Sequence, residues 1–232
     1  MTEPDQQPEN DARPLSRLFG LVMRKERWTL SLRGWLAVLV CLGSVGAFVA
    51  WGLHPFLAVN RPVDGEFLVI EGWIPGYAVE EGMKEFQAHK YGRFFTTGGP
   101  SRGDAAAEAY PTLAELAATH LKKLGLPPEV VEPIRSPAVI RDRTYSSAVG
   151  LRKWFEEHRV SVKAVNVMTV GTHARRSRLM FEKALDGKVA VGIIAIQNQA
   201  YDPKRWWKSS EGTKETISEA VAYLYARLFF HP

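Results

Sequence analysis

The stretch that most constrains the fold is Lys163–Phe181, with the sequence KAVNVMTVGTHARRSRLMF. Its first part, Ala164–Val170, is apolar and rich in β-branched residues, which is typical of a strand buried on both faces of a parallel sheet. The chain then breaks at Gly171 and restarts as a helix, for which we predict Thr172 as the N-cap. A buried strand that turns directly into a helix indicates an α/β fold.

The start of this helix carries an unusual number of cations: His173, Arg175, Arg176 and Arg178. A helix N-terminus has a partial positive charge, so cations there are unfavourable unless an anion lies among them. Ligands of open α/β sheets bind beyond the carboxyl ends of the strands, which is where this turn would lie. The sequence therefore predicts a site for an anionic ligand at this turn.

The rest of the chain alternates between strands and helices in the same way. We predict further strands at 66–71, 93–97, 130–134 and 189–196, and helices at 77–90, 105–123, 144–158 and 213–229. This order predicts an α/β, Rossmann-like three-layer sandwich of about five mostly parallel strands, spanning residues 66–232. No G-x-G-x-x-G fingerprint follows the first strand and no P-loop is present, so we expect no nicotinamide or Walker-type nucleotide site.

Two details of the predicted helices are open to test. Asp104 is the predicted cap of the helix over 105–123, with a restart at Pro111 as the alternative. The last helix places four large apolar residues on one face, and we predict that this face packs on the sheet, with a membrane contact as the alternative. These residues are Ile217, Val221, Leu224 and Leu228.

An uncharged apolar run, Gly34–Leu53, precedes the α/β domain. Its length of about 20 residues suffices to span a bilayer core, with Trp35 and Trp51 near its two ends. The Lys/Arg excess lies before the run, which places the N-terminus in the cytoplasm and the domain outside. We predict a basic, partly disordered tail over 1–33, a transmembrane helix over 34–53 and a linker over 54–65; a buried core helix and a cleaved signal peptide are the alternatives.

The composition of the chain limits the classes of partner that it can bind. A net charge of +5 over 232 residues, without a Lys/Arg run or an aromatic RNA-binding motif, argues against nucleic acid. The lipid bilayer, through residues 34–53, is therefore the partner that the sequence predicts, while protein partners are not identified by it. The single cysteine, Cys41, lies inside the apolar run, so the α/β domain holds no thiol or disulfide.

Four predicted strand-to-helix turns meet at one crevice. Gly98 and Gly99 allow close backbone approach, and arginines offer paired donors for phosphate or carboxylate. The predicted ligand-binding residues are Glu71, Gly72, Trp73, Gly98, Gly99, Arg102, Arg143, Thr144, Gly171 and Thr172.

For catalysis, the candidates are His173, Arg176 and Glu108. Imidazole titrates near neutral pH, so His173 would act as general acid or base, and Glu108 or Glu71 would orient or deprotonate a water. Arg176 and Arg143 would neutralise phosphate charge. No compact ligand spacing such as H-E-x-x-H is present, so we predict no metal; a metal hydrolase built on Glu71, Asp104, Glu108 and His173 is the weakest alternative.

Several motifs together resemble one known family. They are T-G-G at Thr97–Gly99, E-A at Glu108–Ala109, G-x-P at Gly125–Pro127, R-T-Y at Arg143–Tyr145 and H-x-x-R at His173–Arg176. In this order and spacing they resemble the YdcF/SanA/ElyC family from Glu66 to about Gln197. The chain departs from the family pattern at Glu71-Gly72-Trp73, where a Gly-rich turn is usual, and at Ser147, where Asn is usual.

The resemblance carries expectations about fold, place and activity. It implies a Rossmann-like domain outside a bacterial inner membrane, held by one N-terminal helix, with a role in envelope integrity and cell-wall precursor metabolism. The expected function is to bind or transform an anionic, phosphorylated envelope metabolite, lipid-linked or free, in a basic crevice at the carboxyl ends of the strands. No cofactor is expected from the residues; S-adenosylmethionine is associated with the YdcF branch and is what that likeness would suggest. The alternative is a non-catalytic envelope scaffold, with Trp73, Trp206 and Trp207 as partner contacts.

Overall fold

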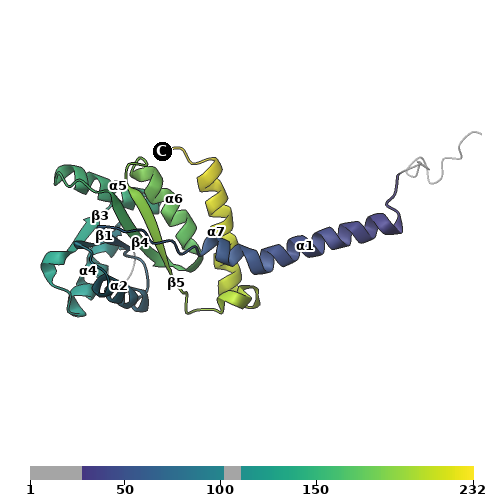
Figure 1. Ribbon diagram of the computed structural model, residues 1–232, viewed down its shortest axis with the longest axis horizontal. Coiled ribbons are helices and arrows are strands. Elements are labelled where there is room, and N and C mark those ends of the chain that lie inside the picture. The colour runs from purple at the N-terminus through teal and green to yellow at the C-terminus, as the bar shows by residue number, and fades with distance from the viewer. Residues whose placement is uncertain (1–27, 102–110) are drawn as a thin grey trace, which may run out of the picture. The chain divides into compact units, whose positions relative to one another are not determined.

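The computed structural model of the chain describes residues 28–101 and 111–232. The chain divides between Gly43 and Ser44 into two compact units. The second unit contains a five-stranded sheet whose strands all run parallel, in the order β3-β2-β1-β4-β5. The strands are β1 (Phe67–Glu71), β2 (Arg93–Gly98), β3 (Val131–Arg135), β4 (Ala164–Val170) and β5 (Ala190–Ile196). The predicted α/β sheet is thus confirmed (Figure 1).

Helices cover both faces of the sheet. α2 (Gly76–Ala88) and α4 (Leu113–Lys123) pack on one face, around Ile70 and Phe94. α5 (Arg143–Glu157) and α6 (Ala174–Ala184) pack on the other, around Phe95 and Val167 (Figure 1). Because both faces are buried, β4 is apolar along nearly its whole length, which explains why its sequence stood out. The two core layers confirm the predicted Rossmann-like sandwich.

The strand order also locates a crevice. β1 is central, and the chain moves outward from it to β2 and β3 on one side and to β4 and β5 on the other. The connections that follow β1 and β4 therefore leave the sheet toward opposite faces. A crevice forms between them, at the carboxyl ends of these two strands. Glu71 ends β1 and Val170 ends β4, so the turns that follow them face a common opening.

The predicted helix over 105–123 is described only from residue 111 onward, and there α4 begins at Leu113. Thr112 accepts a hydrogen bond from the Glu115 backbone, and the Glu115 carboxylate accepts one from the Thr112 backbone, which forms a capping box. This start lies within two residues of the predicted restart at Pro111. The predicted cap Asp104 lies outside the described residues.

Before the sheet, α1 (Leu32–Leu57) is longer than the predicted span of 34–53. It has 26 residues and a mean hydropathy of 2.2, so it is long and apolar enough to cross a membrane. Its last turn extends past Pro55 because His54 and Leu57 are buried against the domain.

The predicted linker over 54–65 is wrong in part, because much of it is bound to the sheet. Arg61 forms an antiparallel bridge with Ile193 in β5, and the Val63 backbone donates a hydrogen bond to Asn166 Oδ1 at 2.8 Å. Asn166 is a buried polar residue in β4. It satisfies backbone groups that a free linker would leave to water.

The last helix, α7 (Ser210–Leu228), corrects a second prediction. The four apolar residues predicted to pack on the sheet are exposed instead: Ile217 by 43%, Val221 by 62%, Leu224 by 55% and Leu228 by 59%. α7 turns its other face inward, with Gly212, Thr216 and Ala226 buried. This inner face also carries two glutamates, and their partners, described below, explain the orientation.

Candidate functional site

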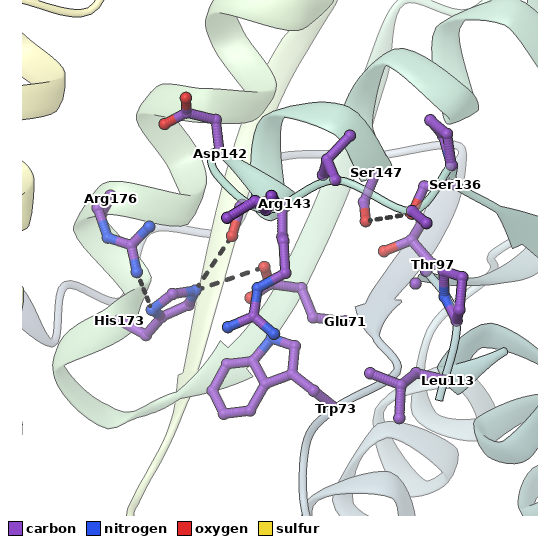
Figure 2. Close-up of a pocket in the computed structure, with 18 of the residues that line it drawn as sticks. Glu71, Trp73, Thr97, Leu113, Ser136, Asp142, Arg143, Ser147, His173 and Arg176 are labelled. Carbon is purple, nitrogen blue, oxygen red and sulfur yellow. Dashed lines mark hydrogen bonds and ion pairs between the residues drawn. The ribbon is translucent and has the colours of Figure 1, made fainter. Parts of the chain in front are cut away.

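A pocket of about 670 Å³ lies at the carboxyl ends of β1, β2 and β4, beside the start of α5 (Figure 2). Its size suits a small metabolite. The residues that line it are Glu71, Trp73, Thr97, Gly98, Gly99, Pro100, Leu113, Ser136, Pro137, Ala138, Val139, Ile140, Asp142, Arg143, Thr144, Ser147, His173, Arg176 and Glu219.

A buried ionic cluster forms one wall of the pocket. His173 Nδ1 lies 2.8 Å from Glu219 Oε1, and His173 Nε2 lies 3.5 Å from Glu71 Oε1. Arg176 binds the same Glu219 through Nε at 2.8 Å and Nη2 at 2.9 Å. Ser177 donates a hydrogen bond to Glu71 Oε2 at 2.9 Å. The imidazole is thus held between two carboxylates that come from β1 and α7.

These contacts set the protonation of His173. Burial alone would lower its pKa, but the charge of Glu71 and the hydrogen bond to Glu219 raise the pKa to about 9. Burial alone would raise the pKa of Glu71, but the charge and hydrogen bond of His173 and the Ser177 hydroxyl lower it to about 2. Hydrogen bonds from Arg176 and His173 likewise bring the pKa of Glu219 to about 2, against the effect of burial.

The raised pKa favours the imidazolium form of His173 at neutral pH, against the expectation of a group that titrates near neutrality, because two carboxylates face the same ring. Arg176 Nη2, which can only donate, also lies 2.9 Å from Nδ1. An imidazolium can donate a proton or a hydrogen bond but cannot act as a base. Its Nε2 lies 3.5 Å from Glu71 Oε1 and 3.5 Å from Thr144 Oγ1, so this nitrogen is directed at groups of β1 and α5 that also line the pocket.

The other wall of the pocket is open and partly apolar. Trp73 is 46% exposed and meets the His173 ring edge to face, with ring centroids 5.0 Å apart. Figure 2 shows Arg143 extending from the start of α5 toward Trp73. Within residues 28–101 and 111–232, no hydrogen bond or ion pair engages the Arg143 guanidinium. Asp142, just before it, holds a left-handed backbone at φ 54° and has no side-chain cap bond.

The four cations at the start of α6 and in the 3-10 turn before it have partners that the sequence did not reveal. Arg176 and His173 bind Glu219, and Arg178 binds Glu182 at 2.8 Å. Arg175 lies over the Phe56 ring, 3.9 Å from its centroid. The anion predicted among these cations is thus supplied largely by the protein itself, through Glu219 on α7.

Among the described lining residues the charges also balance, so the basic character expected of the crevice is not seen in this part of it. Among its described residues, three cations face three carboxylates. The cations are Arg143, His173 and Arg176, and the carboxylates are Glu71, Asp142 and Glu219. Among the described lining residues, Arg143 is the cation that no described residue engages.

Most predicted site residues come together in the pocket. Those that line it are Glu71, Trp73, Gly98, Gly99, Arg143, Thr144, His173 and Arg176. Two others, Arg102 and Glu108, lie outside the described residues, so the predicted role of Glu108 in catalysis stays a prediction.

Three predicted ligand-binding residues do not line the pocket. Gly72 packs against the backbone of Leu113, where a side chain would clash, so its role is close packing. Gly171 has φ 55° and lies against Glu215. Thr172 is not an N-cap: it belongs to a 3-10 turn before α6, and its hydroxyl donates to Glu215 Oε1 at 3.1 Å. Both residues therefore contact Glu215 on α7, which does not line the pocket.

The residue that sequence reasoning missed is Glu219. It lies 46 positions after His173, and only the fold brings the two together. One signal was present: Gly212, Thr216, Glu219 and Tyr223 recur at helical spacing, which is a small and polar face that could pack against other polar groups. The larger apolar residues on the opposite face drew the prediction away from it.

The tryptophans proposed as partner contacts differ in accessibility. Trp206, in η3 (Pro203–Lys208), is buried and donates a hydrogen bond to the Ala50 carbonyl at 2.9 Å. Trp207 packs edge to face on Trp51, with ring centroids 6.0 Å apart. Trp206 therefore cannot contact a partner, and Trp73 is the tryptophan that remains open at the pocket.

Within the part of the chain that the structure describes, no group of three or more His, Cys, Asp or Glu side chains is placed to hold a metal ion. The two nitrogens of His173 are both directed at carboxylates, which is unlike a metal ligand. Comparison of the sequence with protein-family models and with curated proteins found no match.

Proposed function

We propose that this chain is a membrane-anchored protein whose α/β domain binds an anionic, phosphorylated metabolite in the pocket between β1 and β4. The observation that carries the proposal is an Arg143 guanidinium that no described residue engages, in one pocket with His173, whose pKa is raised to about 9. The likeness of the sequence motifs to the YdcF/SanA/ElyC family supports the same proposal, because the fold it implies is the one observed.

The chemistry of these groups selects phosphate. A guanidinium offers two parallel N–H donors that match two phosphate oxygens. The Arg143 and Thr144 backbone N–H groups begin α5, a helix of 15 residues whose N-terminus adds partial positive charge. His173 lines the opposite wall of the pocket. We infer that the donors of Arg143 and of the α5 N-terminus bind two or more phosphate oxygens.

The apolar part of the lining suggests what the phosphate is attached to. Trp73, Leu113, Pro137, Val139 and Ile140 supply apolar surface around the polar centre, and Ile140 is 88% exposed at the rim. A ligand with an apolar or aromatic portion would cover this surface. Together with a membrane anchor, this favours a lipid-linked phosphate over a free sugar phosphate.

The protonation of His173 also limits the chemistry that the pocket can support. If the bound ligand reacts, His173 can give a proton to a leaving-group oxygen, and Arg143 can stabilise negative charge on the phosphate. The Thr144 hydroxyl lies near His173, but a protonated imidazole cannot activate it as a nucleophile. Acid-assisted transfer or hydrolysis is thus the reaction class that the site favours.

The anchor is α1. Its length, its hydropathy and the Lys/Arg excess before it support a single span with the N-terminus in the cytoplasm and the domain outside a bacterial inner membrane. A reporter that is active only outside the cytoplasm, fused after Pro232, should be active. Activity of a strictly cytoplasmic reporter at the same position would reverse the orientation.

Ligand binding is tested by thermal unfolding of the full chain in detergent, with inorganic pyrophosphate as the probe. At one hundred times its Kd, pyrophosphate should stabilise the protein by about 2.7 kcal/mol. Arg143→Ala should weaken binding by about tenfold or more, because a charge-assisted hydrogen bond is lost.

The matched control is Arg141→Ala, since Arg141 is exposed two residues away but does not line the pocket. It should respond to pyrophosphate like the unchanged protein. The proposal fails if pyrophosphate, phosphate and prenyl phosphates all leave the unfolding temperature unchanged, or if both arginine variants respond alike.

A further inference from the structure

The outer face of α7 is an apolar surface with no protein cover among the described residues. Ile217, Val221, Leu224 and Leu228 follow one another at spacings of four, three and four, so they form one continuous stripe along the helix. Single exposed apolar residues are ordinary, but a stripe along a whole helix marks an interaction surface. Tyr225 and Phe229, exposed by 52% and 69%, widen it.

This stripe adjoins the end of α1. Within the second unit, Trp206 binds the Ala50 carbonyl, Trp51 packs on Trp207, and Phe56 packs on Tyr223 with ring centroids 5.7 Å apart. Trp51 and Phe56 are themselves exposed by 67% and 44%. The apolar surface of α7 therefore continues that of a helix apolar enough to lie in a membrane.

The two ring contacts come from different elements. Trp207 lies in η3, before α7 begins at Ser210, whereas Tyr223 lies within α7. The end of α1 therefore contacts both η3 and α7.

The polar groups beside the stripe indicate which occupant fits. Lys204 and Lys208 are exposed next to Trp207, and Arg227 is exposed in the last turn of α7. Cations and aromatic rings flanking an apolar helix face are typical of helices that lie at lipid headgroups. A second copy of the chain placed symmetrically on this face would bring like cations together, which disfavours it.

We propose that the outer face of α7, together with Trp51 and Trp207, lies in the lipid–water interface, so that the bilayer covers it. This rests on the proposal that α1 spans the membrane, and adds a second, peripheral contact. The inner face of α7 supplies Glu219 to the pocket. The pocket would then lie about one helix diameter, roughly 10 Å, from the bilayer surface, within reach of a lipid-linked phosphate.

The test uses the full chain in nanodiscs that hold one copy each, with an environment-sensitive fluorophore on a single cysteine. In a Cys41→Ser background, the label is placed by Val221→Cys on the stripe or by Lys122→Cys at the exposed end of α4. The native Cys41 is labelled separately. Nanodiscs carry lipids with a quencher either near the headgroup or deep in the acyl chain.

With headgroup-near quenchers, the label at 221 should lose about half its fluorescence or more and shift to the blue, while the label at 122 should do neither. Deep quenchers should act on Cys41, which verifies the span independently. If Cys41 is quenched but the label at 221 behaves like that at 122, the α7 contact is refuted while the anchor stands.

Two further outcomes would also contradict the proposal. An unquenched Cys41 would refute the anchor itself. A label at 221 that is shielded only in discs loaded with two copies would identify the second copy as the occupant and overturn the lipid contact.

Discussion

The two walls of the pocket are built on opposite principles. On the buried wall, Glu71, His173, Glu219 and Arg176 neutralise one another, and each charge has a partner from a different element. On the open wall, Arg143 and Trp73 are accessible, and no described residue engages the guanidinium. The charges of the first wall are paired within the protein, whereas the second wall presents a guanidinium without a described partner.

This difference separates charges that stabilise the fold from charges that are accessible to a ligand. A buried charge must be paired because its desolvation is costly, so the buried wall tells little about the ligand. An exposed arginine without a partner costs little free energy of folding, because water solvates it, and it stays accessible to an anion. The buried wall nevertheless affects any chemistry proposed for the site, since its two carboxylates raise the pKa of His173 to about 9.

The largest effect should come from breaking the buried wall. Glu71→Gln removes a carboxylate that faces His173 and accepts from Ser177, and should destabilise the protein by about 3–5 kcal/mol. Urea unfolding of the full chain in detergent measures it. Asp186→Asn, which removes a surface partner of Arg152, is the control and should cost about 1 kcal/mol or less. Equal costs for the two variants would show that the cluster is not a structural unit.

The pH dependence of the free energy of unfolding also tests whether the charges of the buried wall stabilise the fold. Folding raises the pKa of His173 from 6.5 to about 9, so its contribution is complete below about pH 6.5 and is lost as the pH rises through 9. Folding lowers the pKa of Glu71 and Glu219 from 4.5 to about 2, so theirs is complete above about pH 4.5 and is lost as the pH falls through 2. Stability should therefore be highest between about pH 4.5 and 6.5.

Denaturant unfolding across this range should show an alkaline decline of a few kcal/mol between pH 6.5 and 9. His173→Gln should remove that decline, whereas His89→Gln, at an exposed position on the α2 side of the sheet, should keep it. An alkaline decline that survives His173→Gln would mean that another group titrates.

On the open wall, Trp73→Ala should affect binding and leave stability nearly unchanged. The ring supplies apolar surface to the pocket, so its loss should weaken binding of geranyl pyrophosphate by about tenfold. Binding of inorganic pyrophosphate should change much less, because it has no apolar portion. Calorimetry of both ligands gives the comparison, and equal losses would place Trp73 against the phosphate instead of the lipid.

The smallest effect should come from Asp142→Asn. The change removes a carboxylate from the lining beside Arg143, and should strengthen pyrophosphate binding by about twofold to threefold. Asparagine tolerates the left-handed backbone at this position, so stability should change by about 0.5 kcal/mol or less. Weaker binding would indicate that Asp142 itself contacts the ligand or an ion that accompanies it.

The elements of the sheet could be predicted because their signals are local. β4 lies within an unbroken apolar run, and the helix after it starts where Gly171 breaks that run. Alternation of such runs leaves few topologies, because parallel strands need crossover helices of one hand. The pocket at the strand ends followed from the same reasoning, and eight of the predicted residues line it.

The sequence by itself thus determined the α/β class, the place of the crevice and an apolar helix long enough to span a membrane, because each depends on neighbours in the chain. The partners of charges depend on contacts between distant segments, and only the tertiary structure decided these. Glu219 reaches His173 from 46 positions away, and together with Glu71 it raises the pKa of that imidazole to about 9. α7 turns its polar face inward, against its sequence pattern, because the partners of Glu215 and Glu219 lie on that side, and its four large apolar side chains are left exposed.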